Sequence, residues 1–322
     1  MNVGFIGCGM WAKEAYLPYF RNNKKYKLKA LADIYPEDEG KTMACELGFE
    51  EYYDDYKLML KKGGLDLIII STPHYLHYTQ AKDCLVRGID VHIDKPIASS
   101  KKEAKHLVDL ANKHNAKITV HTQKRFYREN IYLKKQIEIG KLGEVLFVEA
   151  KIWQKLFSDF SGSWRSKSDQ AKGGIAMDSG YHMIDTLIYI FEDEAIDYLT
   201  GYKVNGDHES DRISSINLKI NKASGIINII RGVPESMQSE EITVIGSEGS
   251  IIVSRKKEEG TKFYTICHYH KGKLINYEKR IVLNGDQEKT APLEYVLKGS
   301  SNKVIGSKSL KTIDILEKHY LN

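Results

Sequence analysis

The sequence is poor in cysteine, and its cysteines do not form the pairs that build metal or disulfide sites. Its 322 residues include only four, Cys8, Cys45, Cys84 and Cys267, and none of them belongs to a C-x-x-C arrangement. Scattered cysteines of this kind indicate neither a zinc knuckle nor a disulfide framework. We therefore expect no metal site, and we expect a reducing, cytoplasmic setting.

Long apolar runs are missing as well. No stretch reaches about 18 consecutive apolar residues, the length that a membrane-spanning helix requires. The chain enters a strand-like run directly after Met1, without the basic start and long apolar core of a secretory signal. The sequence therefore predicts neither membrane insertion nor secretion.

The sequence also lacks a large excess of charge of one sign. The 48 basic and 43 acidic side chains leave a formal net charge of +5, whereas a nucleic-acid binder typically shows a basic stripe and a more extreme isoelectric point. We therefore expect no nucleic-acid partner. A hydrophobic content of 42% and a charged content of 28% are typical of a folded globular protein, so disorder is not expected. The length suits two domains of roughly 100–200 residues each.

In the first third of the chain, short apolar runs alternate with amphipathic segments. The run Leu67–Ile70 is apolar at every position, as in a parallel strand that is covered by helices on both faces. Repeated alternation of strand and helix predicts a doubly wound α/β domain. The predicted strands are 2–6, 27–32, 65–71, 90–93 and 117–120, and the predicted helices lie near 11–22, 37–47, 77–87 and 102–114.

After residue 122 the rhythm changes, and strands follow one another without helices between them. This order favours a second, α+β domain with a large, mostly antiparallel sheet. We expect a Rossmann domain over 1–123 and a substrate-binding and oligomerisation domain over 124–322. The predicted strands are 145–153, 213–220, 225–231, 241–245, 250–254, 262–270 and 275–282, and the predicted helices are 128–140, 181–191 and 310–320.

A glycine fingerprint follows the first predicted strand. Gly7, Gly9 and Ala12 form a G-x-G-x-x-A pattern, with Met10 and Trp11 opening the following helix. In dinucleotide-binding domains the first glycine permits a tight turn, the second lets the pyrophosphate approach the backbone, and the small third residue allows close packing. The free amides of the helix N-terminus then face the phosphates. The alternative is a strand-to-helix turn without a ligand.

Asp33 ends the second predicted strand, 26 residues after Gly7. A carboxylate at this place can accept hydrogen bonds from the adenosine ribose and would repel a 2′-phosphate, so NAD is favoured over NADP. Ile34 and Tyr35 follow it, and no arginine does. The alternative for Asp33 is that it only caps a loop.

Ser71, Thr72, Pro73 and His74 close the apolar strand at the edge where a doubly wound sheet binds its ligand. These residues, and His77 one helical turn later, either contact the cofactor or cap the helix.

Taken together with later motifs, these residues resemble the Gfo/Idh/MocA oxidoreductases, the family of glucose–fructose oxidoreductase and inositol 2-dehydrogenase. The motifs occur in the order of the family and span the first 190 residues. Beyond them the strand-rich pattern fits the C-terminal sheet of the family, without a sharp motif. The matching stretches are 7–12, 32–33, 71–77, 94–96, 123–126, 164–165, 173–174 and 178–185.

The resemblance assigns roles to further residues. The E-K-P motif of the family reads Asp94-Lys95-Pro96 here, with a shorter carboxylate, and the resemblance implies that Lys95 lies beside the nicotinamide and the reacting carbon. Gln123 either contacts the nicotinamide carboxamide or only ends a strand. Trp164 and Arg165 are implied to line the substrate pocket, although a packing role suits both equally.

The D-x-x-x-H motif of the family matches Asp178 and His182 on a predicted helix, which the resemblance places at the substrate. Removing a hydride from a secondary alcohol also requires a base, and histidine titrates near neutral pH. We expect His182 to be this base, Asp178 to orient it and Lys95 to stabilise charge on the reacting oxygen. The alternatives are a helix N-cap for Asp178, a core histidine for His182 and a solvated lysine for Lys95.

The sequence therefore predicts an NAD(P)-dependent dehydrogenase or reductase acting on a sugar, polyol or related hydroxy compound. The family often forms dimers or tetramers, so we expect a homo-oligomer. One alternative is a glycosidase or lyase that oxidises its substrate transiently with bound NAD. Another is a non-catalytic sensor of dinucleotide or sugar, although a sensor has no need for all three of Lys95, Asp178 and His182.

Overall fold

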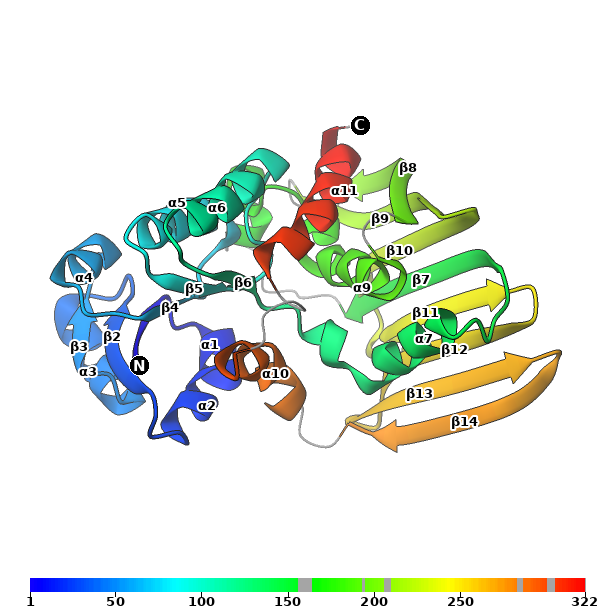
Figure 1. Ribbon diagram of the computed structural model, residues 1–322, viewed down its shortest axis with the longest axis horizontal. Coiled ribbons are helices and arrows are strands. Elements are labelled where there is room, and N and C mark those ends of the chain that lie inside the picture. Colours follow the sequence, from blue (N-terminus) through cyan, green and yellow to red (C-terminus); the bar gives the residue numbers. More distant parts are fainter. Residues whose placement is uncertain (156–163, 193–194, 206–209, 283–285, 300–304, 322) are drawn as a thin grey trace. The chain divides into compact units, whose positions relative to one another are not determined.

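The computed structural model describes residues 1–155, 164–192, 195–205, 210–282, 286–299 and 305–321. The chain forms two compact units (Figure 1). The first comprises Met1–Gln123 and Asp286–Leu310, and the second comprises Lys124–Gly285 and Lys311–Asn322. The segment Asp286–Leu310, which the sequence assigns to the second domain, folds with the first unit.

The first unit contains a parallel six-stranded sheet in the order β3-β2-β1-β4-β5-β6. All four residues of β4 are buried, as its apolar sequence predicts. The strand order reverses direction between β1 and β4, so the crevice expected of a doubly wound sheet opens at their carboxyl ends. The strands are β1 (Asn2–Ile6), β2 (Lys27–Ala32), β3 (Glu51–Tyr53), β4 (Leu67–Ile70), β5 (Asp90–Ile93) and β6 (Ile118–Val120).

The helices of this unit lie between its strands, except for one that returns from the end of the chain. The helix expected near 11–22 is two helices, because Pro18 lacks the N–H group that would continue the first through Tyr16. Leu293 of the returning helix α10 is buried in the same core as Phe5. The helices are α1 (Met10–Ala15), α2 (Leu17–Arg21), α3 (Glu37–Leu47), α4 (Tyr56–Lys62), α5 (His74–Leu85), α6 (Lys101–Lys113) and α10 (Asp286–Leu297).

The second unit contains an eight-stranded sheet in the order β14-β13-β12-β11-β7-β10-β9-β8. Only the pair β7 and β10 is parallel, which confirms the mostly antiparallel sheet. The strands are β7 (Val145–Lys155), β8 (Ile196–Asn205), β9 (Asp211–Ile220), β10 (Ala223–Val233), β11 (Ser239–Gly246), β12 (Gly249–Glu258), β13 (Thr261–His270) and β14 (Lys273–Ile281).

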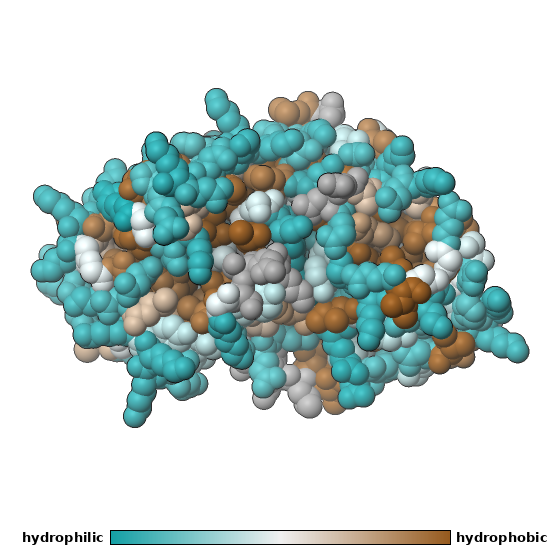
Figure 2. All heavy atoms as spheres, in the orientation of Figure 1, coloured by the Kyte–Doolittle hydropathy of each residue, from teal (hydrophilic) through white to brown (hydrophobic). Residues whose placement is uncertain are grey.

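One face of this sheet is buried. Alternate residues of β7, such as Val148 and Ala150, are fully buried, and α7 and α9 pack on strands β7, β12 and β13. The opposite face leaves apolar side chains partly exposed, including Phe147 and Ile245. Figure 2, seen from the side of α7 and α9, shows scattered apolar groups on a mostly hydrophilic surface. The helices of the second unit are α7 (Arg128–Glu138), α8 (Ser168–Ala171), α9 (Tyr181–Phe191) and α11 (Leu310–Leu321), of which α11 begins with the last residue of the first unit.

No helix within the described ranges combines the length and the apolar character that a membrane crossing demands.

Candidate dinucleotide and active site

The glycine loop after β1 is shaped by two glycines with different surroundings. Gly7 has φ +80°, and a Cβ added there would lie 2.6 Å from the carbonyl oxygen of Ser71, so only glycine fits. Gly9 has φ −68°, and a Cβ added there would have no neighbouring atom within 4 Å. The space in front of Gly9 is therefore open, at the N-terminus of α1.

Asp33 connects the end of β2 to this loop. Its Oδ2 accepts a hydrogen bond of 2.8 Å from the backbone N–H of Cys8, and its Oδ1 accepts one of 2.8 Å from the N–H of Ile34. The hydroxyl group of Tyr52 lies 2.8 Å from the carbonyl oxygen of Asp33 and 2.7 Å from that of Tyr35. The carboxylate is thus fixed beside the glycine loop. Ile34, next to it, is 92% exposed and carries no positive charge.

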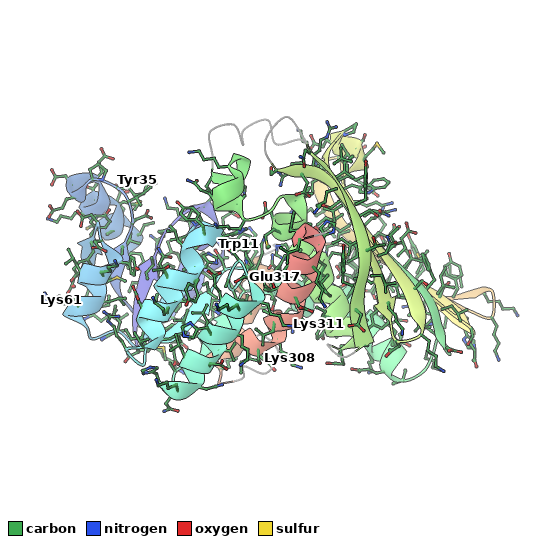
Figure 3. The ribbon with its side chains drawn as sticks, turned by 90° about the horizontal axis from the view of Figure 1, so that it is seen from above. Trp11, Tyr35, Lys61, Lys308, Lys311 and Glu317 are labelled. Atoms are coloured by element: carbon green, nitrogen blue, oxygen red, sulfur yellow. The ribbon has the colours of Figure 1, made fainter. Side chains whose placement is uncertain are left out.

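A cavity of about 290 Å³ lies along these strand ends. It brings together six of the residues that the sequence assigns to the cofactor: Gly7, Gly9, Asp33, Ser71, Thr72 and Pro73. No sequence motif points to the other polar residues that line it, which include Tyr35, Asp54, Tyr56, Tyr75 and Gln80. Figure 3 labels Tyr35 at the surface of the first unit.

These surroundings suit a dinucleotide. The open space before Gly9 leaves room for phosphates beside the free amides of α1, and the carboxylate of Asp33 offers an acceptor to ribose hydroxyls.

Met10, Trp11 and Ala12 do not line this cavity. Met10 is 77% exposed, whereas Ala12 is fully buried and lets the helix approach the sheet. The ring of Trp11 lies edge-on to that of His121, with centroids 5.7 Å apart. Their contribution to the loop is therefore the start and the packing of α1.

Asp94, in place of the family's glutamate, is held by two hydroxyl groups. Ser71 Oγ donates a hydrogen bond of 2.5 Å to Oδ2, and the hydroxyl of Tyr16 donates a short one to Oδ1. Burial raises the pKa of Asp94 to about 6, against the opposing effects of these two hydrogen bonds and the charge of Lys95. Tyr16 is 78 residues away in the sequence, and no local pattern points to it.

His77 links the loop after β4 to the loop that carries Lys95. Its Nδ1 lies 2.6 Å from the carbonyl oxygen of Pro96, and its Nε2 lies 2.9 Å from that of Thr72. Burial lowers the pKa of this imidazole, although both carbonyls oppose that effect. His77 therefore ties two loops together, and it also packs edge-on against the buried His74.

Gln123 ends the first stretch of the first unit and is 9% exposed. Its Oε1 is buried and accepts no hydrogen bond from any residue that the structure describes. A buried acceptor without a donor suits a ligand amide such as a carboxamide.

In the second unit, Asp178 lies in a π-helical turn (Ala176–Gly180) that leads into α9. Such turns often occur at functional sites. The Oδ2 of Asp178 is 3.3 Å from Nε of Arg165 and 3.7 Å from an Nη of Arg231, and the guanidinium of Arg165 lies 4.3 Å from the ring centroid of Trp164. Asp178 does not cap α9, whose N-cap is Gly180.

His182 lies in the first turn of α9 and is partly exposed, so it is not a core residue. Asp185, one turn later, forms a buried ion pair with Arg125 through bonds of 2.6 and 2.9 Å. Asp185 therefore anchors the helix, while His182 and Asp178 stay at its N-terminal end.

The glycine pair before this turn packs against the end of the chain. The hydroxyl of Tyr320 accepts a hydrogen bond of 2.7 Å from the N–H of Gly174 and donates one of 2.9 Å to Asp211. A Cβ on Gly174 would lie 1.7 Å from Oδ1 of Asp211. The sequence motif identifies the glycines, but neither Tyr320 nor Asp211, which hold the turn.

Within the described ranges, no three His, Cys, Asp or Glu side chains are grouped so that they could hold a metal ion.

Two family models match this chain. Residues 1–122 match the model described as "Oxidoreductase family, NAD-binding Rossmann fold", and residues 131–252 match the "GFO/IDH/MocA C-terminal domain". The two models together cover about three quarters of the chain.

Two curated relatives illustrate the similarity. An uncharacterized oxidoreductase of Schizosaccharomyces pombe is 30% identical over 201 residues, which are 59% of this chain and 52% of the relative. The D-glucoside 3-dehydrogenase of Escherichia coli is 26% identical over 190 residues, 59% of this chain and 54% of the relative. The chain thus spans about half the length of these relatives.

Among solved structures, the WlbA dehydrogenase from Bordetella pertussis, in complex with NADH and UDP-GlcNAcA, has the same fold. The TM-score is 0.81 at 20% sequence identity, over 100% of this chain and 95% of that one.

Proposed function

Because the chain belongs to the Gfo/Idh/MocA family of oxidoreductases, we propose that it transfers a hydride between a nicotinamide dinucleotide and a hydroxyl-bearing carbon of a sugar, polyol or related compound. The observation that carries the proposal is the cavity in which the Gly7–Gly9 loop and Asp33 come together. The E. coli relative that acts on a D-glucoside supports the substrate class.

NAD is the proposed cofactor, in preference to NADP. The amides at the start of α1 would bind its phosphates across Gly9, and Asp33 would accept hydrogen bonds from the adenosine ribose. A 2′-phosphate would meet the charge of Asp33 without a neighbouring cation, since Ile34 follows it. When bound, the nicotinamide supplies the hydride acceptor or donor.

The protein's own groups would handle the proton and the charge. We propose that His182 accepts the proton of the substrate hydroxyl and that the Lys95 ammonium stabilises negative charge on the same oxygen. Asp178, held by Arg165 and Arg231, would orient the histidine and the substrate. Trp164 and Arg165 would contribute to substrate binding, and Asp94 and Gln123 to the nicotinamide side.

We further propose that the residues from 124 onward bind the substrate and form a homo-oligomer. The partly exposed apolar residues Phe147, Ile245 and Tyr277 on the sheet of the second unit support an interface there. A cytoplasmic location is proposed because all four cysteines are free thiols.

Purified protein with NAD and a panel of sugars and polyols tests the proposal through the absorbance of reduced nicotinamide at roughly 340 nm. Turnover is expected with at least one of these compounds. The Lys95→Met and His182→Ala variants should lose about 100-fold or more of it and keep their affinity for NAD. The proposal would be contradicted if protein that binds NAD turned over none of the compounds. It would also be contradicted if both variants turned over a substrate as fast as the wild type.

A further inference from the structure

A second cavity, of about 240 Å³, lies within the second unit at one end of strands β7, β11, β12 and β13. Four basic residues are among those that line it, together with Tyr127 and Gln154. The basic residues are Arg255, Lys256, Lys257 and Lys262. We call this the basic cavity.

The positive charge of the basic cavity is only partly neutralised. Lys257 pairs with Glu235 at 3.0 Å, and Glu240, which also lines the cavity, pairs with Lys124 at 2.6 Å. Lys256 and Lys262 are exposed and have no ion-pair partner in the part of the chain that the structure describes. The cavity therefore has two cations outside its ion pairs, of which Lys262 also acts electrostatically on Glu240.

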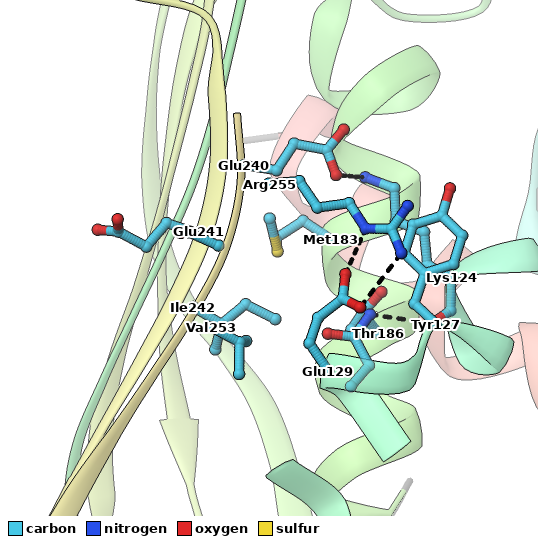
Figure 4. Close-up of a pocket in the computed structure, with 12 residues that line it drawn as sticks. Lys124, Tyr127, Glu129, Met183, Thr186, Glu240, Glu241, Ile242, Val253 and Arg255 are labelled. Carbon is cyan, nitrogen blue, oxygen red and sulfur yellow. Dashed lines mark hydrogen bonds and ion pairs between the residues drawn. The ribbon is translucent and has the colours of Figure 1, made fainter. Parts of the chain in front are cut away.

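One cation is held rigidly in place. The guanidinium of Arg255 lies 3.4 Å from the ring centroid of Tyr127, and its Nη2 is 3.1 Å from Oε2 of the buried Glu129 (Figure 4). Stacking on an aromatic ring and pairing with a carboxylate restrict the rotamers of Arg255 before any ligand binds. An anion bound beside it costs little further ordering.

The electrostatics of Glu240 agree with a positive potential at this place. Burial by itself raises the pKa of a carboxyl group, yet the pKa of Glu240 is lowered overall by the charge and the hydrogen bond of Lys124 and, to a smaller extent, by the charges of Arg255 and Lys262. These cations therefore favour a negative charge in the basic cavity.

The basic cavity adjoins the turn that carries Asp178. Gln154, in its wall, accepts a hydrogen bond of 2.6 Å from the hydroxyl of Ser179, the residue after Asp178 in the π-helical turn. A ligand that reaches Asp178 and His182 with one of its hydroxyl groups can therefore extend past Gln154 into the basic cavity.

We propose that the basic cavity is a subsite for an anionic group of the substrate, so that the protein acts on a sugar bearing a phosphate, diphosphate or carboxylate. This inference rests on the proposed function. It narrows the substrate class from sugars in general to sugars that carry an anionic group, which the positive potential of the basic cavity would attract.

Calorimetric titration of the 322-residue protein, saturated with NAD, tests this inference. The probes are glucose, glucuronate, glucose 6-phosphate and UDP-glucose, which differ in their anionic group. At least one anionic probe is expected to bind tenfold or more tightly than glucose, with a Kd that rises with added salt. The probe that binds best identifies the carboxylate, the phosphate or the diphosphate.

The double variant Lys256→Gln/Lys262→Gln should lose tenfold or more in affinity for that probe. Lys219→Gln, an exposed lysine on β9 outside the cavity, is the matched control and should bind like the wild type. The inference is overturned if no anionic probe binds more tightly than glucose, or if the double variant keeps its affinity. Titration with NAD alone separates this result from a failure of the proposed function, which would show as absent NAD binding.

Discussion

The backbone N–H of Cys8 donates a hydrogen bond of 2.8 Å to the carboxylate of Asp33. The residue that would recognise the cofactor's ribose therefore also orders the loop that would hold its phosphates. The Asp33 carboxylate cannot move without disturbing the glycine loop, so cofactor preference and loop geometry are coupled in this protein.

Asp33→Asn should relax the preference for NAD. The single oxygen of asparagine can still accept the N–H of Cys8 and keep the loop, although the bond from the N–H of Ile34 is lost, while the charge that repels a 2′-phosphate is removed. We expect the ratio of kcat/KM for NAD over NADP to fall by about tenfold or more. Asp38→Asn, on α3 outside the cavity, should leave the ratio unchanged. An unaltered ratio in Asp33→Asn would show that Asp33 does not select the cofactor.

Gly7→Ala and Gly9→Ala should separate stability from binding. The alanine at position 7 meets the Ser71 carbonyl and a positive φ, so we expect the free energy of unfolding to fall by about 2 kcal/mol or more. The alanine at position 9 has open space and an ordinary φ, so folding should be unaffected, but its methyl group would occupy the space for phosphate. Urea unfolding and NAD titration measure the two effects. If the two variants had the same unfolding free energy and the same affinity for NAD, the separate roles given to Gly7 and Gly9 would be wrong.

How much of the fold and of the candidate site can be predicted from the sequence depends on how far apart along the chain the interacting residues lie. The apolar run of β4 and the glycine fingerprint are local patterns, and they were sufficient to predict the Rossmann fold and part of its cavity. The hydrogen bonds from Tyr16 to Asp94 and from Gly174 to Tyr320 join residues 78 and 146 positions apart. Only the folded chain brings such pairs together, because their side chains carry no local periodicity.

The same limit applies to secondary structure. Strand β8 and helix α10 were not predicted, and α10 has Pro292 in its interior, which argues against a helix when the sequence is considered alone. Its buried Leu293, packed in the core of the first unit, supplies the tertiary contact that overrides this local preference.

Asp94→Asn should change how stability depends on pH. Because burial raises the pKa of Asp94 from 3.8 to about 6, the folded protein binds this proton more tightly than the unfolded chain does. Its contribution to stability is therefore present below about pH 4 and is lost as the pH rises to about 6. Relative to the wild type, the variant should gain unfolding free energy between these pH values. Denaturation curves at several pH values measure the difference, and parallel profiles for the two proteins would contradict the raised pKa.

Tyr320→Phe should loosen the turn before α9. Loss of the hydroxyl leaves the N–H of Gly174 without its acceptor and Oδ1 of Asp211 without the donor Tyr320, so we expect the unfolding free energy to fall by about 1–3 kcal/mol. Turnover should fall as well, with NAD affinity retained, because this turn carries Asp178. Tyr202→Phe, at a position that is 67% exposed, is the control and should change stability by less than about 0.5 kcal/mol. Wild-type stability in Tyr320→Phe would show that the Tyr320 hydroxyl does not stabilise the turn before α9.

The most direct test of the central claim follows a single hydrogen atom. A sugar substrate that carries deuterium on the carbon bearing the reacting hydroxyl is incubated with the protein and NAD, and the reduced cofactor is analysed by mass spectrometry. Direct hydride transfer predicts deuterium in the reduced nicotinamide of the wild type, and little or no labelled cofactor from Lys95→Met. Unlabelled reduced cofactor, or label that stays in the sugar product without net reduction of NAD, would contradict the proposed dehydrogenase.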